Sequence, residues 1–68
     1  MYVDVAGRIF DLRHERGWSQ SELARRSGVH NVTISRLEGE IEAPRLVTLR
    51  KLAKAFDVPV GELKEPKG

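Results

Sequence analysis

The chain of 68 residues contains no cysteine, and aromatic residues make up only 6% of it. Without cysteine, neither a disulfide nor a cysteine-based metal cluster can stabilise the fold, and a reducing cytoplasm is the expected location. No apolar run approaches the roughly 18 residues that a membrane-spanning helix requires. The first residues also lack the basic region and apolar stretch of a secretory signal. We therefore expect a soluble, cytoplasmic protein with no membrane contact.

The sequence also lacks a strong excess of charge of either sign. Twelve Lys and Arg against ten Asp and Glu give a formal net charge of +2. This mildly basic balance suits nucleic acid but fits many soluble domains, so the distribution of charge matters more than its total. A chain this short buries only about 60% of the surface that it exposes when unfolded, so the core must be thin.

Apolar residues recur at helical spacing, and no run alternates with the period of a strand. In the first segment Val5, Ile9 and Leu12 share one face, and Gly17 follows as a helix-ending residue. The predicted helices cover residues 3–16, 20–27, 31–38 and 45–56, with one further turn over 60–63. We predict an all-α fold, a compact bundle of four to five short helices in one domain over 1–63, with a polar C-terminal tail over 64–68.

The second helix has a clear start signal. Ser19 and Glu22 have the spacing of a capping box, in which the Ser19 hydroxyl accepts from the Glu22 amide and the Glu22 carboxylate returns to the Ser19 amide. Trp18 and Leu23 flank this box and can form a hydrophobic staple. The helix must stop before Gly28, and at about eight residues it needs packing to be stable.

Two short helices meeting across a glycine form the most informative part of the sequence. A helix that crosses another after a turn of three or four residues needs a small residue at the close approach, which Ala24 supplies, and Gly28 eases the turn. Ile34 and Leu37 then point inward. The outward positions carry side chains that mostly can form hydrogen bonds: Asn31, Val32, Thr33, Ser35 and Arg36.

The stretch Gln-Ser-Glu-Leu-Ala-Arg-Arg-Ser-Gly-Val-His-Asn-Val-Thr-Ile-Ser-Arg-Leu-Glu, residues 20–38, resembles the helix-turn-helix of the Xre and lambdoid phage repressor and Cro family. The similarity extends from the end of the first helix to Leu63, nearly the whole chain. It implies a lambda repressor-like DNA-binding domain with residues 31–38 as a recognition helix in the major groove. Eight residues span roughly 12 Å, which is comparable to the groove width of about 12 Å.

The resemblance also implies residue roles. Gln20 matches a glutamine that touches the phosphate backbone and braces the recognition helix, and Arg45 matches a position near the backbone or minor groove; outward Ser35 is a third expected backbone contact. Arg13 and Glu38 match a structural pair that joins the first helix to the end of the third. The positions expected to read bases are Asn31, Val32, Thr33 and Arg36.

Three features depart from the family pattern. His30 stands where a Ser, Thr or Asp cap is favoured, so the sequence leaves open whether His30 or Asn31 caps the third helix. Glu40 stands where glycine is frequent, with Gly39 one place earlier, which leaves open a shift of the helix end by one residue. Glu40 and Glu42 also place negative charge in a loop that often faces phosphates in such proteins.

We predict sequence-specific binding of double-stranded DNA by a transcriptional regulator, expected to be a repressor. One recognition helix reads few base pairs, so a homodimer on a pseudo-palindromic operator is expected, at least on DNA. Apolar residues near the C-terminus form the expected dimer interface: Val58, Pro59, Val60 and Leu63. The alternative function is a protein-interaction module, such as an antitoxin or adaptor, with a protein partner.

Catalysis and metal binding are not expected. The sequence has no glycine-rich phosphate loop, and so small a bundle leaves little room for a catalytic pocket. His14 and His30 lack acidic or cysteine neighbours at ligand spacing. We therefore predict no enzyme activity, no cofactor and no metal site.

Overall fold

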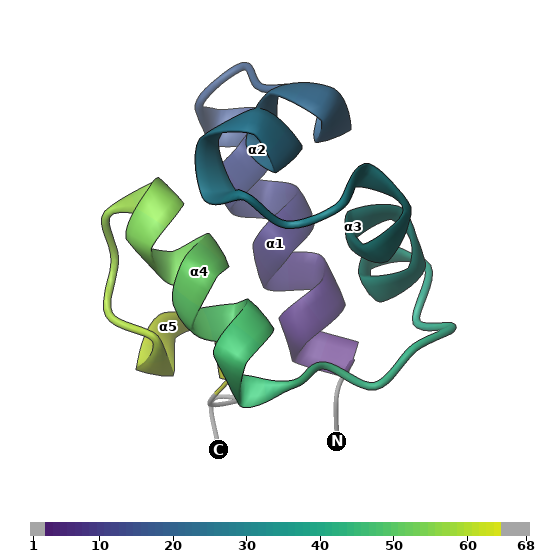
Figure 1. The fold of residues 1–68 in the computed structure, drawn as a ribbon. Coiled ribbons are helices and arrows are strands. Elements are labelled where there is room, and N and C mark those ends of the chain that lie inside the picture. Colours follow the sequence, from purple (N-terminus) through teal and green to yellow (C-terminus); the bar gives the residue numbers. More distant parts are fainter. Residues whose placement is uncertain (1–2, 65–68) are drawn as a thin grey trace.

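Five helices follow one another in the computed structural model, which describes residues 3–64 (Figure 1). They are α1 (Val3–Glu15), α2 (Gln20–Ser27), α3 (Asn31–Glu38), α4 (Leu46–Phe56) and α5 (Gly61–Lys64). No strand occurs within this described range, so the predicted all-α class is confirmed. Residue 64 ends α5, and residues 65–68 of the predicted tail lie outside the described residues.

The helix boundaries follow from local chemistry. Gly17 and Gly28 adopt positive φ values of 70° and 78°, a left-handed conformation that costs glycine little and that ends α1 and α2. Ser19 caps α2, since its Oγ accepts from the Glu22 amide at 3.0 Å. The reciprocal half of the predicted capping box is wrong: the Glu22 carboxylate accepts hydrogen bonds from Arg25 and Arg26 instead.

The structure also settles the two open questions about α3. His30 occupies the N-cap position without a side-chain hydrogen bond, and Asn31 is the first residue of the helix. Helix α3 ends at Glu38, and Gly39 has an ordinary φ of −86°. The left-handed position falls on Glu40, with φ 59°, so this glutamate adopts the conformation that usually favours glycine.

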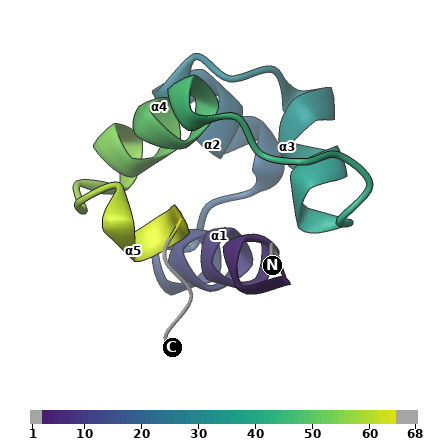
Figure 2. The same cartoon turned by 90° about the horizontal axis from the view of Figure 1, so that it is seen from below.

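The core lies where all five helices meet. Helix α1 packs against α3 and α5, while α2 packs against α3 and α4. Seen from below, α5 bridges α1 and α4 and closes that side of the bundle (Figure 2). The largest fully buried side chains come from every helix: Ile9, Leu23, Ile34, Leu52, Phe56 and Leu63.

The ends of α1 and α4 are tied together beside this core. Trp18, which follows α1, is half-buried and stacks on Phe56 with ring centroids 5.8 Å apart. Arg16 donates from Nη2 to the Phe56 carbonyl at 2.7 Å. These contacts fix the segment that leads into α2, and thus the position from which α2 and α3 depart.

Burial corrects one part of the expected dimer interface. Leu63 is only 1% exposed and belongs to the core, because α5 turns its apolar side toward α1 and α4. Val58 and Val60 are half-buried against the core, and Pro59 is exposed. Leu63 is therefore unavailable to a partner.

Within residues 3–64, every helix is too short or too polar to cross a bilayer.

Candidate nucleic-acid interface

The turn between α2 and α3 positions the candidate interface. The Gly28 amide donates to the Ala24 carbonyl at 2.9 Å, and the Val29 amide donates to Ser27 Oγ at 3.1 Å. Val29 is buried, so it fixes the start of the crossing from inside, and Ala24 is half-buried between the helices. The small residue and the glycine thus lie where the sequence places them.

Helix α3 has one buried side and one exposed side. Ile34 and Leu37 are 0% and 3% exposed and anchor the helix in the core. Thr33 is half-buried, so it is the least accessible of the residues predicted to read bases. The outward positions that the structure leaves exposed are Asn31, Val32, Ser35 and Arg36.

A buried ion pair holds the far end of α3 against α1. Arg13 donates from Nε to Glu38 Oε2 and from Nη2 to Glu38 Oε1, each at 2.8 Å. A third donor of Arg13, Nη1, reaches the Trp18 carbonyl at 2.9 Å. The Arg13 side chain is 9% exposed and that of Glu38 is 8% exposed. Hydrogen bonding to Glu38 raises the pKa of Arg13, because the carboxylate favours the charged form of the guanidinium.

Gln20 connects α2 to the same pair. Its Nε2 donates to Glu38 Oε1 at 3.1 Å, so residues from α1, α2 and α3 share one carboxylate. This bond braces α3 from the side of α2. The Gln20 side-chain oxygen is not used in that bond, and the residue is half-buried at the first position of α2.

A second link between α2 and α3 involves a residue that the sequence reasoning missed. Asn31 Nδ2 donates to Ser21 Oγ at 3.1 Å, and both residues are exposed. Ser21 lies one position after Gln20 in the first turn of α2. No sequence signal marks this serine, because the contact depends on how the two helices cross.

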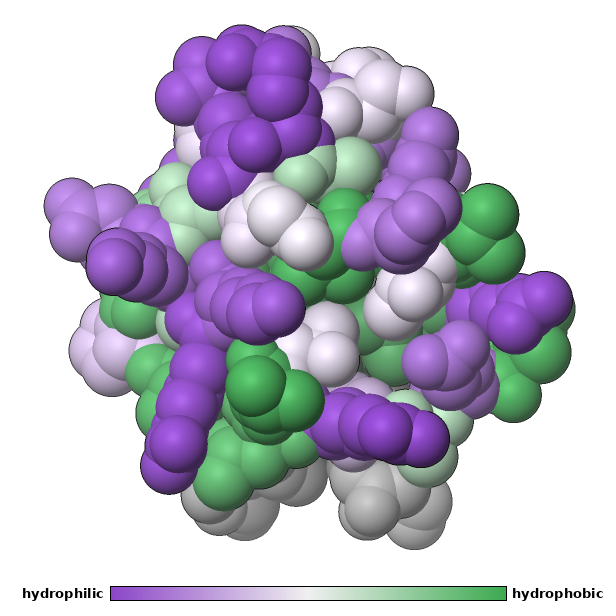
Figure 3. All heavy atoms as spheres, viewed as in Figure 1, coloured by the Kyte–Doolittle hydropathy of each residue, from purple (hydrophilic) through white to green (hydrophobic). Residues whose placement is uncertain are grey.

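The loop between α3 and α4 mixes charges of both signs. Arg36 Nη1 lies 3.9 Å from Glu42 Oε1, with side-chain exposures of 58% and 36%. Arg45 is exposed at the N-cap position of α4, where the sequence predicts a backbone contact. Glu40 is exposed at the start of the loop, directly after Gly39. In the view of Figure 3, hydrophilic side chains are spread over the surface with hydrophobic ones between them.

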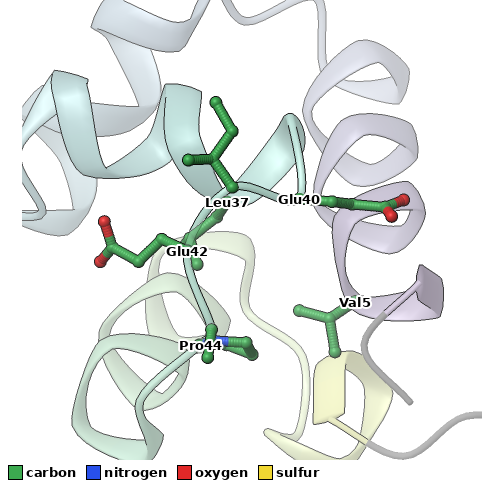
Figure 4. Close-up of a pocket in the computed structure, with 7 residues that line it drawn as sticks. Val5, Leu37, Glu40, Glu42 and Pro44 are labelled. Carbon is green, nitrogen blue, oxygen red and sulfur yellow. The ribbon is translucent and has the colours of Figure 1, made fainter.

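A shallow hollow lies beside this loop, between residues 40–44 and α1 (Figure 4). Val5 and Leu37 form its inner wall, and the side chains of Glu40 and Glu42 point away from each other on either side of the loop. Its volume of 220 Å³ is below the roughly 300 Å³ at which small-molecule sites begin.

Within residues 3–64, no three His, Cys, Asp or Glu side chains group as metal ligands would.

Comparison with known proteins places this geometry among regulators. The family model described as Helix-turn-helix, HTH_3, matches residues 9–63. The cryptic phage CTXphi transcriptional repressor RstR of Vibrio cholerae is 41% identical over 58 residues, which are 85% of this chain and 52% of the repressor. Antitoxin HipB of Escherichia coli K12 is 34% identical over 56 residues, 82% of this chain and 64% of the antitoxin. The chain thus spans about half to two thirds of these relatives.

A solved structure agrees over nearly its full length. The restriction-modification controller protein C.AhdI from Aeromonas hydrophila superposes with a TM-score of 0.85 and 34% sequence identity. The match covers 91% of this chain and 94% of that chain. The arrangement of five helices is therefore shared with a protein of similar size.

Proposed function

The chain belongs to the helix-turn-helix family HTH_3, and we propose that it binds double-stranded DNA at a preferred sequence and acts in the cytoplasm as a transcriptional repressor. Its relatives are named as a transcriptional repressor, an antitoxin and a controller protein. We therefore propose that the chain has no catalytic activity.

The observation that carries the proposal is the two-sided character of α3. Its inner side is locked by Ile34 and Leu37, and its end is held by the bond between Glu38 and Arg13. Its outer side presents mostly polar side chains to solvent. A rigid helix of eight residues with such an exposed side fits a major groove about 12 Å wide.

Each exposed residue has a chemical match on DNA. Arg36 can donate two hydrogen bonds to guanine, and Asn31 can pair with the N6 and N7 edge of adenine. Val32, 54% exposed, and the half-buried Thr33 can contact a thymine methyl. The phosphate backbone contacts are assigned to Gln20, Ser35 and Arg45, since such contacts position a protein without reading sequence.

Selection of bound sequences from random double-stranded DNA tests this proposal. We expect enrichment of one short motif, with binding that weakens as salt rises because phosphate contacts release counterions. A chain that enriches no sequence over several rounds contradicts sequence-specific binding.

We further propose that two copies bind one operator. Two recognition helices on the same side of DNA lie about 10 to 10.5 base pairs apart, so the selected site should be a pseudo-palindrome. With Leu63 buried, the remaining candidates for the contact between copies are Val58, Pro59 and Val60. Sedimentation with and without the selected DNA should show two chains per site, and a single chain on an asymmetric site contradicts the proposal.

A protein-interaction role is the second candidate. The likeness to antitoxin HipB favours it, as do exposed apolar side chains such as Ile41, 78% exposed, and Val47, 58% exposed. Gel mobility shift with genomic fragments, compared with affinity capture of proteins from lysate, separates the two functions. Capture of a stoichiometric protein without any DNA shift favours the second.

A further inference from the structure

The exposed hydrogen bond between α2 and the first residue of α3 has a consequence for sequence reading. We propose that Ser21 is a positioning residue, which holds the carboxamide of Asn31 in the orientation needed to read an adenine. This inference rests on the proposed DNA-binding function and adds a residue outside the recognition helix to those that set sequence preference.

The carboxamide of Asn31 needs such a partner to be ordered. The terminal torsion of an asparagine side chain is broad and roughly two-fold, so an exposed amide samples several orientations. Asn31 is exposed, and it does not occupy the N-cap position, which His30 holds. Its Nδ2 donates to Ser21 Oγ at 3.1 Å across the helix crossing. One hydrogen bond to a neighbouring helix therefore limits the rotation of the amide.

The anchoring atom is itself well placed. Ser21 lies in the first turn of α2, whose start is fixed by the bond from the Glu22 amide to Ser19 Oγ at 3.0 Å. Leu23 is fully buried two residues later and holds the same turn in the core. The hydroxyl of Ser21 is thus carried by a rigid backbone, as a positioning group must be.

The chemistry of the amide allows both contacts at once. An asparagine side chain has one oxygen acceptor and two N–H donors. Pairing with adenine uses the oxygen and one N–H, and the second N–H remains for Ser21 Oγ. The bond to Ser21 therefore does not consume the edge that reads the base; it selects the rotation in which that edge faces away from α2.

Gln20, the neighbour of Ser21, serves a different partner. Its Nε2 donates to Glu38 Oε1, and Glu38 is already bound by Arg13 through two hydrogen bonds. Gln20 braces the far end of α3 through Glu38, while Ser21 contacts the near end through Asn31. The two adjacent residues of α2 therefore act at opposite ends of the recognition helix.

The test compares sequence preference in four variants by in vitro selection and by titration of the selected DNA. Asn31→Ala identifies the base pair read by Asn31, because preference is lost there. Ser21→Ala should reduce preference at that same base pair by about 2- to 10-fold, the size of one net hydrogen bond. Ser21→Thr keeps the hydroxyl and should restore it. Ser35→Ala is the matched control, expected to weaken binding equally on all sequences.

Amide exchange measured by NMR without DNA tests the hydrogen bond between Ser21 and Asn31 directly. In the native protein the side-chain amide protons of Asn31 should exchange slowly with water by NMR, and Ser21→Ala should speed their exchange while Ser35→Ala should not. Ser21→Ala overturns the proposal if it leaves preference unchanged, weakens all sequences equally, or still acts in the Asn31→Ala background. Failure of the proposed function is distinct, since the native chain itself would then select no sequence.

Discussion

Arg13 and Glu38, 25 residues apart in the chain, form two parallel hydrogen bonds of 2.8 Å in a site where each side chain is less than a tenth exposed. This pair makes the position of the recognition helix depend on α1, which contributes no predicted DNA contact. A second interhelical pair, Arg8 with Glu62, is 45% and 43% exposed and offers a direct comparison.

Glu38→Gln should destabilise the domain far more than Glu62→Gln. Removing one partner of a buried pair leaves the other charge uncompensated, which costs about 3 to 5 kcal/mol, whereas an exposed pair contributes about 0 to 1 kcal/mol. Urea denaturation followed by circular dichroism measures both. Equal losses in the two variants would show that burial of the pair carries no special weight.

Arg36→Ala and Gln20→Ala should both weaken DNA binding, but only the loss in Arg36→Ala should depend on the DNA sequence. Loss of a base contact at Arg36 should cost about 1 to 3 kcal/mol on the selected sequence and much less on random DNA. Loss of a backbone contact at Gln20 should weaken all sequences to a similar degree. Fluorescence anisotropy with both DNAs gives the comparison. An altered consensus for Gln20→Ala would contradict its assignment to the backbone.

Glu42→Gln should strengthen binding to every DNA. The Glu42 carboxylate lies 3.9 Å from Arg36 Nη1, so it competes with DNA for that guanidinium and repels phosphates near it. We expect an increase in affinity of about 2- to 5-fold, as for one exposed ion pair, that fades at high salt. Glu15→Gln makes the same change in net charge at an exposed residue of α1. A similar gain in that variant would mean that net charge alone is responsible.

Glu40→Gly should stabilise the fold. Glu40 has φ 59°, and the left-handed conformation costs a residue with a side chain about 1 to 2 kcal/mol that glycine avoids. We expect a gain of about 1 kcal/mol, or about 4 to 8 °C in Tm for a domain of this size. Glu40→Ala removes the same charge but keeps the strain, so it should bring no such gain. Thermal denaturation of both variants decides whether backbone strain is the cause.

The ion pairs of Glu22 with Arg25 and Arg26 should make stability depend on pH in the acid range. The hydrogen bond from Arg25, supported by that from Arg26, lowers the pKa of Glu22 below its ordinary value of 4.5. Because the folded state holds the proton less tightly than the unfolded state, this stabilisation is present above pH 4.5 and is lost as pH falls through the lowered pKa. Glu22→Gln should therefore reduce Tm at pH 7 and match the native chain in strong acid. A difference independent of pH would contradict this origin.

The limits of α2 were predictable because local chemistry fixes them. Ser19 supplies a cap three residues before Glu22, and Gly28 supplies a left-handed end, so neither boundary depends on distant parts of the chain. The left-handed conformation of Glu40 could not be predicted, because the residue has no local preference for it. It arises from the path that the loop must take from α3 to α4.

The hydrogen-bond partners of Gln20 and Ser21 could not be predicted from the sequence either. Gln20 and Ser21 are neighbours, yet one bonds Glu38 and the other Asn31, a choice set by the angle between α2 and α3. The burial of Leu63 was misjudged for a related reason. A turn of four residues has too few positions to show which side is apolar, and only the packing of α5 between α1 and α4 reveals it.

The burial of Leu63 also bears on how the chain is made. This side chain fills part of the core cluster, and the bond from Arg8 to Glu62 links residues 54 positions apart. On the ribosome, α2 and α3 are synthesised before Leu63, so they leave the exit tunnel first. A nascent chain that has reached Phe56 therefore possesses all of α3, but its core still lacks the Leu63 side chain, which α5 supplies.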